Sequence, residues 1–252
     1  MKWNFRGKLS DCLLLSYRTP AESVRDLVPS GLQLITRGPW AFWNVVACRV
    51  EHVRPEGLPA WSGLGYHHIA YRLLTRCITT DAEFVDGLYF VRSYADHAFV
   101  TAMGQYVTDF RFQPASIRVG SGGFAVDRDA TVVELGDPTP AVELAATWAP
   151  DSCFPTLKDA QEYLRYRPLS MAPDGRGKAR LAEVTRDDRA WRERPVNVAA
   201  HRHALFDELG QRDATLELAT AIDPIDYRWS LGRTVGLLGY QPAQRQPADS
   251  VA

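Results

Sequence analysis

The sequence predicts a mostly β protein, built as an antiparallel sandwich or a closed barrel rather than as a doubly wound α/β sheet. Strand-length apolar segments follow one another at short spacing, and regular helical crossovers between them are missing. The 252 residues, 46% of them apolar and 23% charged, suffice for one globular domain whose core needs no disulfide or metal. We expect this single domain over residues 1–240 and a disordered tail over residues 241–252.

The chain is expected to open with a strand and a short helix. Residues 12–17 form a near-continuous apolar run of strand length. Residues 19–22, Thr-Pro-Ala-Glu, match a capping box with proline at the first helical position, and the apolar residues 24, 27 and 28 share one helical face. The Pro-Ser-Gly sequence at residues 29–31 ends that helix.

The middle of the chain is expected to be a series of strands with one helix. Apolar segments alternate with glycine-rich or Asp-Pro turns, which is the pattern of short strands joined by tight connections. Asp96 is placed to cap a helix over residues 97–107. The expected strands cover residues 32–36, 40–50, 65–77, 87–95, 111–119, 124–135 and 140–149.

The last third is expected to combine two helices with four strands. Thr156 and Asp159 form a second capping box at the start of a helix with one apolar face. Residues 173–177, Pro-Asp-Gly-Arg-Gly, predict a hairpin turn. The inner helix face consists of Leu157, Ala160, Tyr163 and Leu164, and a short helix near 200–209 joins strands near 166–172, 178–187, 214–222 and 225–238.

Charge and composition exclude several functions. The formal net charge of -1 removes the electrostatic basis for nonspecific nucleic-acid binding. No segment approaches the roughly 20 apolar residues of a membrane span, and the start of the chain lacks the apolar region of a secretory signal. We therefore expect a cytoplasmic protein. Glycine-rich phosphate-binding motifs and the G-x-S-x-G motif are missing, so nothing predicts nucleotide binding or serine-hydrolase chemistry.

Metal and disulfide chemistry are not expected either. The four cysteines are spread over the chain without a C-x-x-C pair, and most are expected to be small core residues. His201 and His203 lie in a segment that looks helical, where side chains two residues apart diverge and do not form a convergent ligand pair. The sequence therefore predicts no metal and no cofactor.

The candidate site residues are polar side chains on otherwise apolar strand faces, because burying them costs free energy unless they are paired. Asn44 is the polar member of the face formed by residues 42, 44, 46, 48 and 50. Arg92 lies between Phe90 and Tyr94 on the face of another strand. If the sheet closes into a barrel, these residues are expected to project into one cavity.

The strand that begins at Tyr66 adds further candidates. One face carries His68 and Arg72 and the other carries His67 and Tyr71, so at most one of the adjacent histidines serves a given site. We expect Asn44, His68, Arg92 and Arg111 to share a cavity in which the arginines bind an anion and the histidine transfers a proton. The alternative is that these polar side chains face solvent or satisfy a bulge.

Several segments, in their order along the chain, resemble the acetoacetate decarboxylase-like superfamily. Residues 13–20 and 24–32 resemble its opening strand, helix and turn, and residues 54–59, 87–91, 162–167 and 182–184 before Trp191 resemble its DUF2071 (YqjF-like) branch. The resemblance covers about residues 10–238. It implies a conical or barrel-like sheet closed around a central cavity, a few peripheral helices, and a possible homo-oligomer.

The same resemblance argues against the decarboxylase reaction. There, a lysine forms a Schiff base with a β-keto acid, and the matching positions are near Phe112 and Gln113, next to Arg111. An arginine stays protonated and cannot replace the amine nucleophile. The position of the decarboxylase's glutamate falls near residues 67–69, where this chain has no glutamate. The DUF2071 branch has Asn-x-Arg where this chain has His-Ile-Ala, at residues 68–70. Arg92 on the next strand is a candidate to replace the arginine of that motif. The lysines of this chain are Lys2, Lys8, Lys158 and Lys178.

The sequence therefore predicts a small-molecule enzyme that acts on an anionic carbonyl or carboxylate compound without a Schiff-base lysine, by lyase, dehydratase, cyclase or isomerase chemistry. Arg92 and Arg111 are expected to hold the anionic group or a developing enolate, and His68 to move a proton. Two rivals are a noncatalytic binding or regulatory protein with the same cavity, and a structural subunit without one. The expected substrate-binding residues are Asn44, His67, Tyr71, Arg72 and Tyr94.

Overall fold

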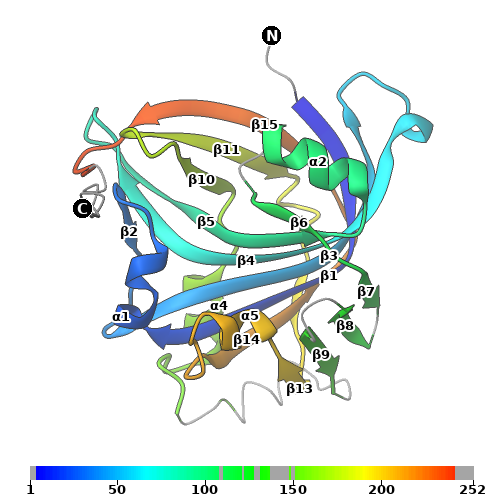
Figure 1. Cartoon of the computed structure of the whole chain (residues 1–252). Helices are drawn as coiled ribbons and strands as arrows, with labels where there is room; N and C mark the ends of the chain where they lie inside the picture. Colours follow the sequence, from blue (N-terminus) through cyan, green and yellow to red (C-terminus); the bar gives the residue numbers. More distant parts are fainter. Residues whose placement is uncertain are drawn as a thin grey trace, which may run out of the picture.

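The computed structural model describes residues 4–107, 110–120, 122–127, 131–136, 148 and 151–241. Within these residues most of the regular structure belongs to an 11-stranded sheet and a 4-stranded sheet, so the predicted mostly β class is confirmed (Figure 1). The large sheet contains β1 (Asn4–Pro20), β2 (Leu32–Leu34), β3 (Trp40–Pro55), β4 (Leu64–Ile78), β5 (Phe84–Ala95), β6 (Phe112–Pro114), β10 (Leu169–Pro173), β11 (Lys178–Arg186), β12 (Glu193–Pro195), β14 (Thr215–Ile222) and β15 (Ile225–Gly236). The small sheet contains β7 (Ile117–Gly120), β8 (Gly123–Val126), β9 (Thr131–Leu135) and β13 (Val198–Arg202), and the α-helices are α1 (Ala21–Val24), α2 (Ala98–Val107), α4 (Leu157–Leu164) and α5 (Ala204–Glu208).

The long strands pair in an order that returns to its starting point. β1 pairs with β3, and the pairing continues through β4, β5, β10, β11 and β15 back to β1. Within this ring the pair of β5 with β10 is parallel and the other pairs are antiparallel; β6, outside the ring, also pairs with β5 in parallel. The large sheet is therefore mixed, which corrects the expectation of a purely antiparallel sheet.

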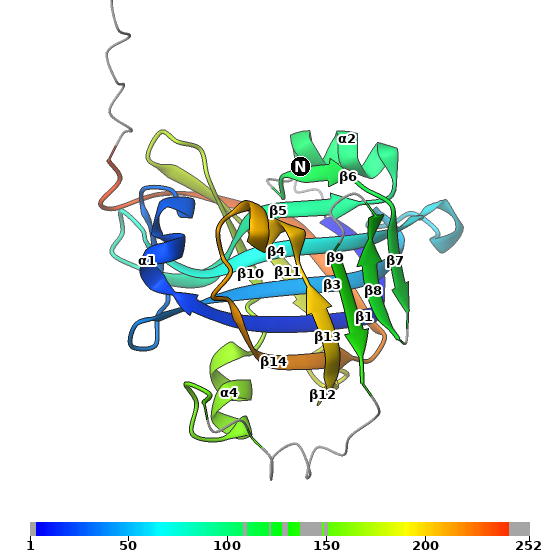
Figure 2. The same cartoon turned by 60° about the horizontal axis from the view of Figure 1, so that its bottom comes forward.

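The large sheet is covered on both faces. On one face, Leu15, Trp43 and Ile69 pack against α5 and the small sheet, which lie together on that side (Figure 2). On the opposite face, Leu14 and Val46 belong to a second cluster that includes residues of α4. Coverage of both faces explains why the central strands read as nearly continuous apolar runs instead of alternating ones. Among the described residues, no helix has both the length and the apolar character to cross a membrane.

The first helix is shorter than its sequence predicts. α1 has four residues and continues as a 3-10 turn over Arg25–Leu27. Its N-cap is Pro20, and the hydroxyl of Thr19 donates to Gln211 Oε1 (3.0 Å) rather than capping the helix. The predicted capping box is therefore wrong here, because β1 extends through Pro20 and carries the threonine with it.

The capping box at the later helix is confirmed. The Asp159 backbone N–H donates to Thr156 Oγ1 (3.1 Å), and Leu157, Ala160 and Leu164 are buried. The predicted hairpin over residues 173–177 joins β10 to β11. The helix expected after Asp96 is α2, although the Asp96 carboxylate accepts hydrogen bonds from the His67 backbone N–H and pairs with its ring.

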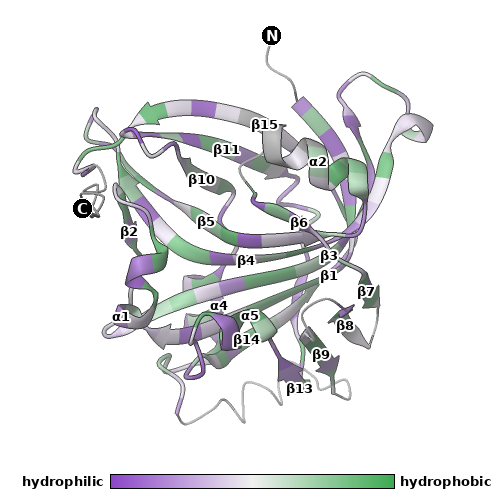
Figure 3. Cartoon of the chain, viewed as in Figure 1, coloured by the Kyte–Doolittle hydropathy of each residue, from purple (hydrophilic) through white to green (hydrophobic). Residues whose placement is uncertain are grey.

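Two further segments differ from the sequence prediction. The strand expected over residues 124–135 is two strands, β8 and β9, and the one over residues 111–119 is β6 and β7. His201 and Arg202 belong to β13, not to a helix. This strand is largely exposed, and its apolar residues 198–200 are followed by a hydrophilic end (Figure 3), so it lacks an alternation that distinguishes strand from helix. The strand expected over residues 140–149 lies outside the described residues except for Trp148, and so does the tail beyond Gln241.

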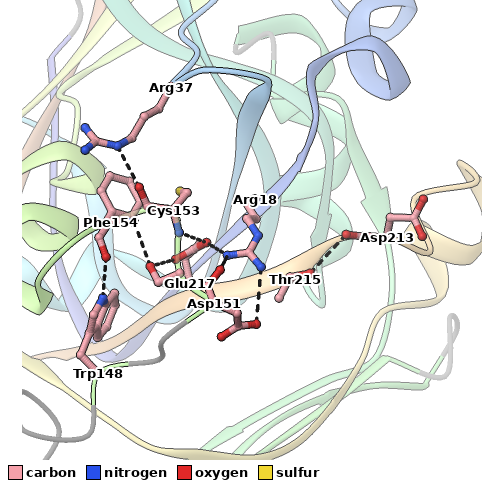
Figure 4. A network of polar contacts seen from close by, with 10 residues as sticks. Arg18, Arg37, Trp148, Asp151, Cys153, Phe154, Asp213, Thr215 and Glu217 are labelled. Carbon is pink, nitrogen blue, oxygen red and sulfur yellow. Dashed lines mark hydrogen bonds and ion pairs between the residues drawn. The ribbon is translucent and has the colours of Figure 1, made fainter.

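A buried ion pair connects the sheet to the segment before α4 (Figure 4). The Arg18 guanidinium donates to the Glu217 carboxylate and to the Asp151 carbonyl oxygen (2.7 Å). Glu217, whose side chain is 1% exposed, also accepts from the Ser152 hydroxyl (2.5 Å) and the Cys153 backbone N–H (3.3 Å). One carboxylate thus links β1, β14 and the loop that leads into α4.

Glu217→Gln is expected to lower the free energy of unfolding by about 2 kcal/mol, because it removes the buried counter-ion of Arg18 and leaves only the exposed Asp151 carboxylate at 3.6 Å. Urea denaturation of the purified variant measures this change. Glu22→Gln is the matched control: Glu22 pairs with Arg25 on the surface, where both side chains are exposed, so its change is expected to stay within about 0.5 kcal/mol. Equal effects of the two substitutions would contradict the structural role of Glu217.

Candidate functional site

A cavity of about 520 Å³ lies among the strands of the pairing ring. Residues of β1, β3, β4, β5, β11 and β15 contribute to its wall, together with residues of α2, β6 and β14. Such a concave, mostly apolar space with a few polar groups is the usual form of a small-molecule site. The aromatic members of its wall are Phe5, Tyr66, Phe90, Phe99, Phe110, Phe112, Tyr166, Trp191, Tyr227 and Trp229.

A bulge in β1 determines which of its residues face the cavity. Ser10 is paired with Arg49 and Leu13 with Ala47, so two residues of β1 stand opposite the single Cys48 of β3. Asp11 is one of these two residues and has a φ of 46°. Because of the extra residue, Leu9 and Cys12 line the same cavity although they are three residues apart.

Arg72 is the buried cation of the cavity wall. It is 6% exposed, its guanidinium donates to the Asn44 side-chain oxygen, and its Nε donates to the Asn44 carbonyl oxygen (3.4 Å). The guanidinium also lies 5.5 Å from the ring centroid of Phe90. Within the described part of the chain, no carboxylate forms an ion pair with Arg72. A buried charge without a counter-ion is costly, and an anionic ligand in the cavity would supply one.

A second arginine lines the cavity near Tyr166. Arg186 lies 4.2 Å from the Tyr166 ring centroid and 3.3 Å from that of Trp191, and it pairs with the exposed Asp188 (3.1 Å). Burial raises the pKa of Tyr166 to about 12, and the charges of Arg72 and Arg186 act in the opposite direction. Tyr166 therefore keeps its hydroxyl proton and can donate a hydrogen bond to an anionic ligand.

His68 is the titratable ring of the cavity wall. It faces Cys48 across β3 and β4, and its ring lies 5.0 Å from that of Phe112. Its Nε2 is buried and has no hydrogen-bond partner among the described residues. A ring nitrogen without a partner beside a ligand cavity can accept or donate a proton of a bound compound.

Of the four residues expected to converge, only His68 lines the cavity. Asn44 does not line it but accepts hydrogen bonds from the lining residue Arg72, and Arg92 and Arg111 lie elsewhere. Arg92 pairs with Tyr71 across β4 and β5, whereas Phe90 pairs with Arg72. Val91 is therefore an extra residue in β5, and Arg92 faces away from the cavity. There it forms a bidentate ion pair with Glu208 of α5 (2.5 and 2.8 Å), which raises its pKa.

Arg111 and Tyr94 also lie outside the cavity. Arg111 precedes β6, is exposed, has a φ of 52°, and stacks over the Tyr89 ring at 5.2 Å. Phe112, its neighbour, lines the cavity instead. Tyr94 belongs to the cluster on the opposite face of the sheet. The expectation that Arg92 and Arg111 share a cavity with His68 is therefore wrong.

His67 and Tyr71 occupy the opposite face of β4. The His67 Nδ1 forms a hydrogen bond with the Asp96 carboxylate (2.7 Å) beside a separate, polar surface pocket. The Tyr71 hydroxyl contacts His203 Nδ1 (3.0 Å), and the Tyr17 hydroxyl contacts His203 Nε2 (2.7 Å) from the other side. Burial lowers the pKa of His203 to about 3, so its ring is neutral and one nitrogen accepts while the other donates.

Several cavity residues were not among the sequence candidates. Cys48 shares the strand face of Asn44, and its position opposite His68 follows once β3 and β4 are paired, so alternation contained a signal for it. Cys12 lines the cavity because of the bulge in β1, and Phe112 because β6 pairs with β5. Neither feature has a local sequence signature, so the sequence could not predict these two residues.

Comparison with solved structures shows an acetoacetate decarboxylase-like fold. An acetoacetate decarboxylase-like enzyme from Sphingomonas wittichii RW1 superposes with a TM-score of 0.53 at 14% identity, covering 94% of each chain. The enduracididine biosynthesis enzyme MppR in complex with pyruvate gives 0.52 at 15% identity (96% of this chain, 92% of the other). Acetoacetate decarboxylase from Legionella pneumophila gives 0.52 at 14% (95% and 88%).

The chain belongs to the DUF2071 family, described as an uncharacterized conserved protein, whose model matches residues 6–221. This confirms the DUF2071 family expected from the sequence. No curated protein matches the chain. At 14–15% identity, the likeness to these solved structures establishes the fold alone.

Proposed function

We propose that this protein is a small-molecule enzyme that acts on an anionic carbonyl compound without forming a Schiff base. The observation that carries the proposal is the guanidinium of Arg72, which is buried in the wall of an apolar cavity without an acidic partner among the described residues. A carboxylate of the substrate would pair with this charge. MppR, which shares the fold, was solved with pyruvate, a compound that carries both a carbonyl and a carboxylate.

In the proposed reaction Arg72, Asn44 and His68 have different roles. Arg72 holds the carboxylate, and Asn44, which accepts two hydrogen bonds from it, keeps the guanidinium in place. His68 then removes a proton from the carbon next to the carbonyl and returns it at the end of the cycle. Proton transfer of this kind is a step of isomerase, dehydratase, cyclase and lyase reactions alike.

The positions of the lysines support chemistry without an imine. Lys8, Lys158 and Lys178 are exposed, and none of them is among the residues that line the cavity. Lys2 lies outside the described residues. We further propose that the ring of paired strands is the closed, conical wall implied by the family resemblance, with the cavity as its interior.

One observation favours the noncatalytic alternative. Most of the cavity wall is apolar or aromatic, and a binding protein for hydrophobic anions would have such a wall with a single anchoring charge. In that case Arg72 binds the ligand as proposed, but His68 moves no proton. The two functions therefore differ in one measurable property, which is proton exchange on a bound carbonyl compound.

The test uses 4-acetylbenzoate, which combines a carboxylate, an apolar ring and an enolisable methyl ketone. We expect the wild-type protein to accelerate deuterium exchange of the methyl protons in D₂O, measured by proton NMR, and His68→Gln to slow this exchange at least 10-fold. His67→Gln is the matched control, because the adjacent ring faces away from the cavity. Binding without accelerated exchange would refute the enzymatic function and support the carrier.

A further inference from the structure

Cys48 lies in the cavity wall among three other polar side chains, those of Cys12, His68 and Arg72. It stands opposite Cys12 at the bulge of β1 and opposite His68 on β4, and all three residues line the cavity together with Arg72. Two thiols, an imidazole and a guanidinium therefore share one wall of a space that admits small molecules. These four side chains lie together on the adjacent strands β1, β3 and β4 of a mostly apolar wall.

The two thiols have different acidities. A hydrogen bond from Cys12 lowers the pKa of the Cys48 thiol, and His68 and Arg72 lower it further. The same pairing and its burial raise the pKa of Cys12. The thiolate is the nucleophilic form of cysteine, and Cys48 is the thiol that stands opposite His68 across β3 and β4, so Cys48 is the reactive member of the pair.

We propose that Cys48 is a covalent nucleophile that adds reversibly to the carbonyl group of an anionic aldehyde or ketone held in the cavity. This inference rests on the proposed function, since Arg72 has to hold the carboxylate. The Cys48 sulfur forms a bond to the carbonyl carbon, and the electron pair of the C=O π bond moves to the oxygen. The thiol proton passes to His68 and from there to that oxygen, which gives a neutral thiohemiacetal without any oxidant or reductant.

The spacing of the two groups limits the substrate class. The Cys48–His68 pair and the Asn44–Arg72 pair are four residues apart along β3 and β4, which corresponds to about 13 Å along the strands. The guanidinium is held at Asn44, so several atoms have to separate the carboxylate of the ligand from its carbonyl. The aromatic wall suits a flat, apolar spacer. The preferred ligands are therefore aryl or extended oxo acids rather than 2-oxo acids.

The experiment uses 4-formylbenzoate labelled with ¹³C at the aldehyde, mixed with the reduced full-length protein. In the wild-type protein we expect the aldehyde carbon signal to be replaced by that of a tetrahedral carbon, and calorimetry reports binding in the same sample. Cys48→Ser is expected to abolish the tetrahedral signal while binding persists. Cys12→Ser is the matched control and is expected to retain the adduct, because it keeps a hydrogen-bond donor beside Cys48.

The outcomes separate this proposal from the proposed function. If the wild-type protein binds 4-formylbenzoate without forming the tetrahedral species, Cys48 is not the nucleophile, whereas the anion site at Arg72 stands. If an adduct persists in Cys48→Ser, another residue is the nucleophile. If neither binding nor adduct is seen, both proposals fail. Alkylation by iodoacetamide is a second readout: at pH 7, peptide mapping is expected to find Cys48 modified at least 10-fold faster than Cys12, and equal rates would contradict the assignment.

Discussion

Replacing Arg72 by methionine is expected to lower the affinity for 4-acetylbenzoate by about 100-fold, which corresponds to about 2.7 kcal/mol of binding free energy. The guanidinium is the buried cation nearest to Asn44 and has no acidic partner in the described structure, so the ligand loses a charge-assisted hydrogen bond. The free energy of unfolding is expected to change by less than about 1 kcal/mol, because removing a buried charge offsets the loss of the hydrogen bonds to Asn44.

Isothermal titration calorimetry and urea denaturation on the same preparation measure the two quantities. Arg76→Met is the matched control, because Arg76 lies on the same strand but forms an ion pair with Asp86 (2.9 Å) outside the cavity. Its affinity for 4-acetylbenzoate is expected to equal that of the wild-type protein. An Arg72→Met variant that binds the anion as tightly as the wild type would remove the basis of the anion site.

The stability of the protein is expected to fall by about 2 kcal/mol between pH 7 and pH 5 because of His203. Burial lowers the pKa of His203 to about 3 in the folded protein, whereas an unfolded histidine has a pKa of about 6.5. The unfolded chain therefore binds a proton that the folded protein excludes, so the contribution is complete above pH 6.5 and decreases as the pH falls below it. The hydrogen bonds to Tyr17 and Tyr71 hold the neutral ring in place.

The free energy of unfolding as a function of pH, obtained from urea titrations, tests this expectation. His203→Leu is expected to be less stable at pH 7 and to lose most of the slope between pH 6.5 and pH 5. His52→Asn is the control, because His52 is exposed and loses little hydration on folding. A slope that is unchanged in His203→Leu would assign the pH dependence to other groups, such as the neighbouring His201, whose pKa is also lowered by desolvation.

Much of the fold could be predicted because it depends on local patterns. The capping box at Thr156 and the hairpin between β10 and β11 are specified by neighbouring residues, and both are found. The prediction of a helix at β13 was wrong for the opposite reason. Its residues contact little of the core, so neither a period of two nor one of 3.6 is imposed on them, and the strand is determined by pairing with β9.

The candidate site was predicted only where strand alternation is regular. Asn44, His68 and Arg72 lie on uninterrupted stretches of β3 and β4, and their common face follows from a period of two. Arg92 follows the bulge at Val91, and counting in twos from Phe90 assigns it to the wrong face. A bulge is stabilised by the pairing of whole strands, so the residues around it carry no local signal of its presence.

The bulges in β1 and β5 also bear on how this chain can be aligned with its relatives. Each bulge adds one residue to a strand, at Asp11 in β1 and at Val91 in β5. The residues on either side of the bulge still face the same side of the sheet as they would in a regular strand without the extra residue. A relative whose strands are regular needs a one-residue gap inside each of these strands. An alignment that confines gaps to loops equates cavity residues with residues of the outer face, and it transfers site assignments to the wrong side chains.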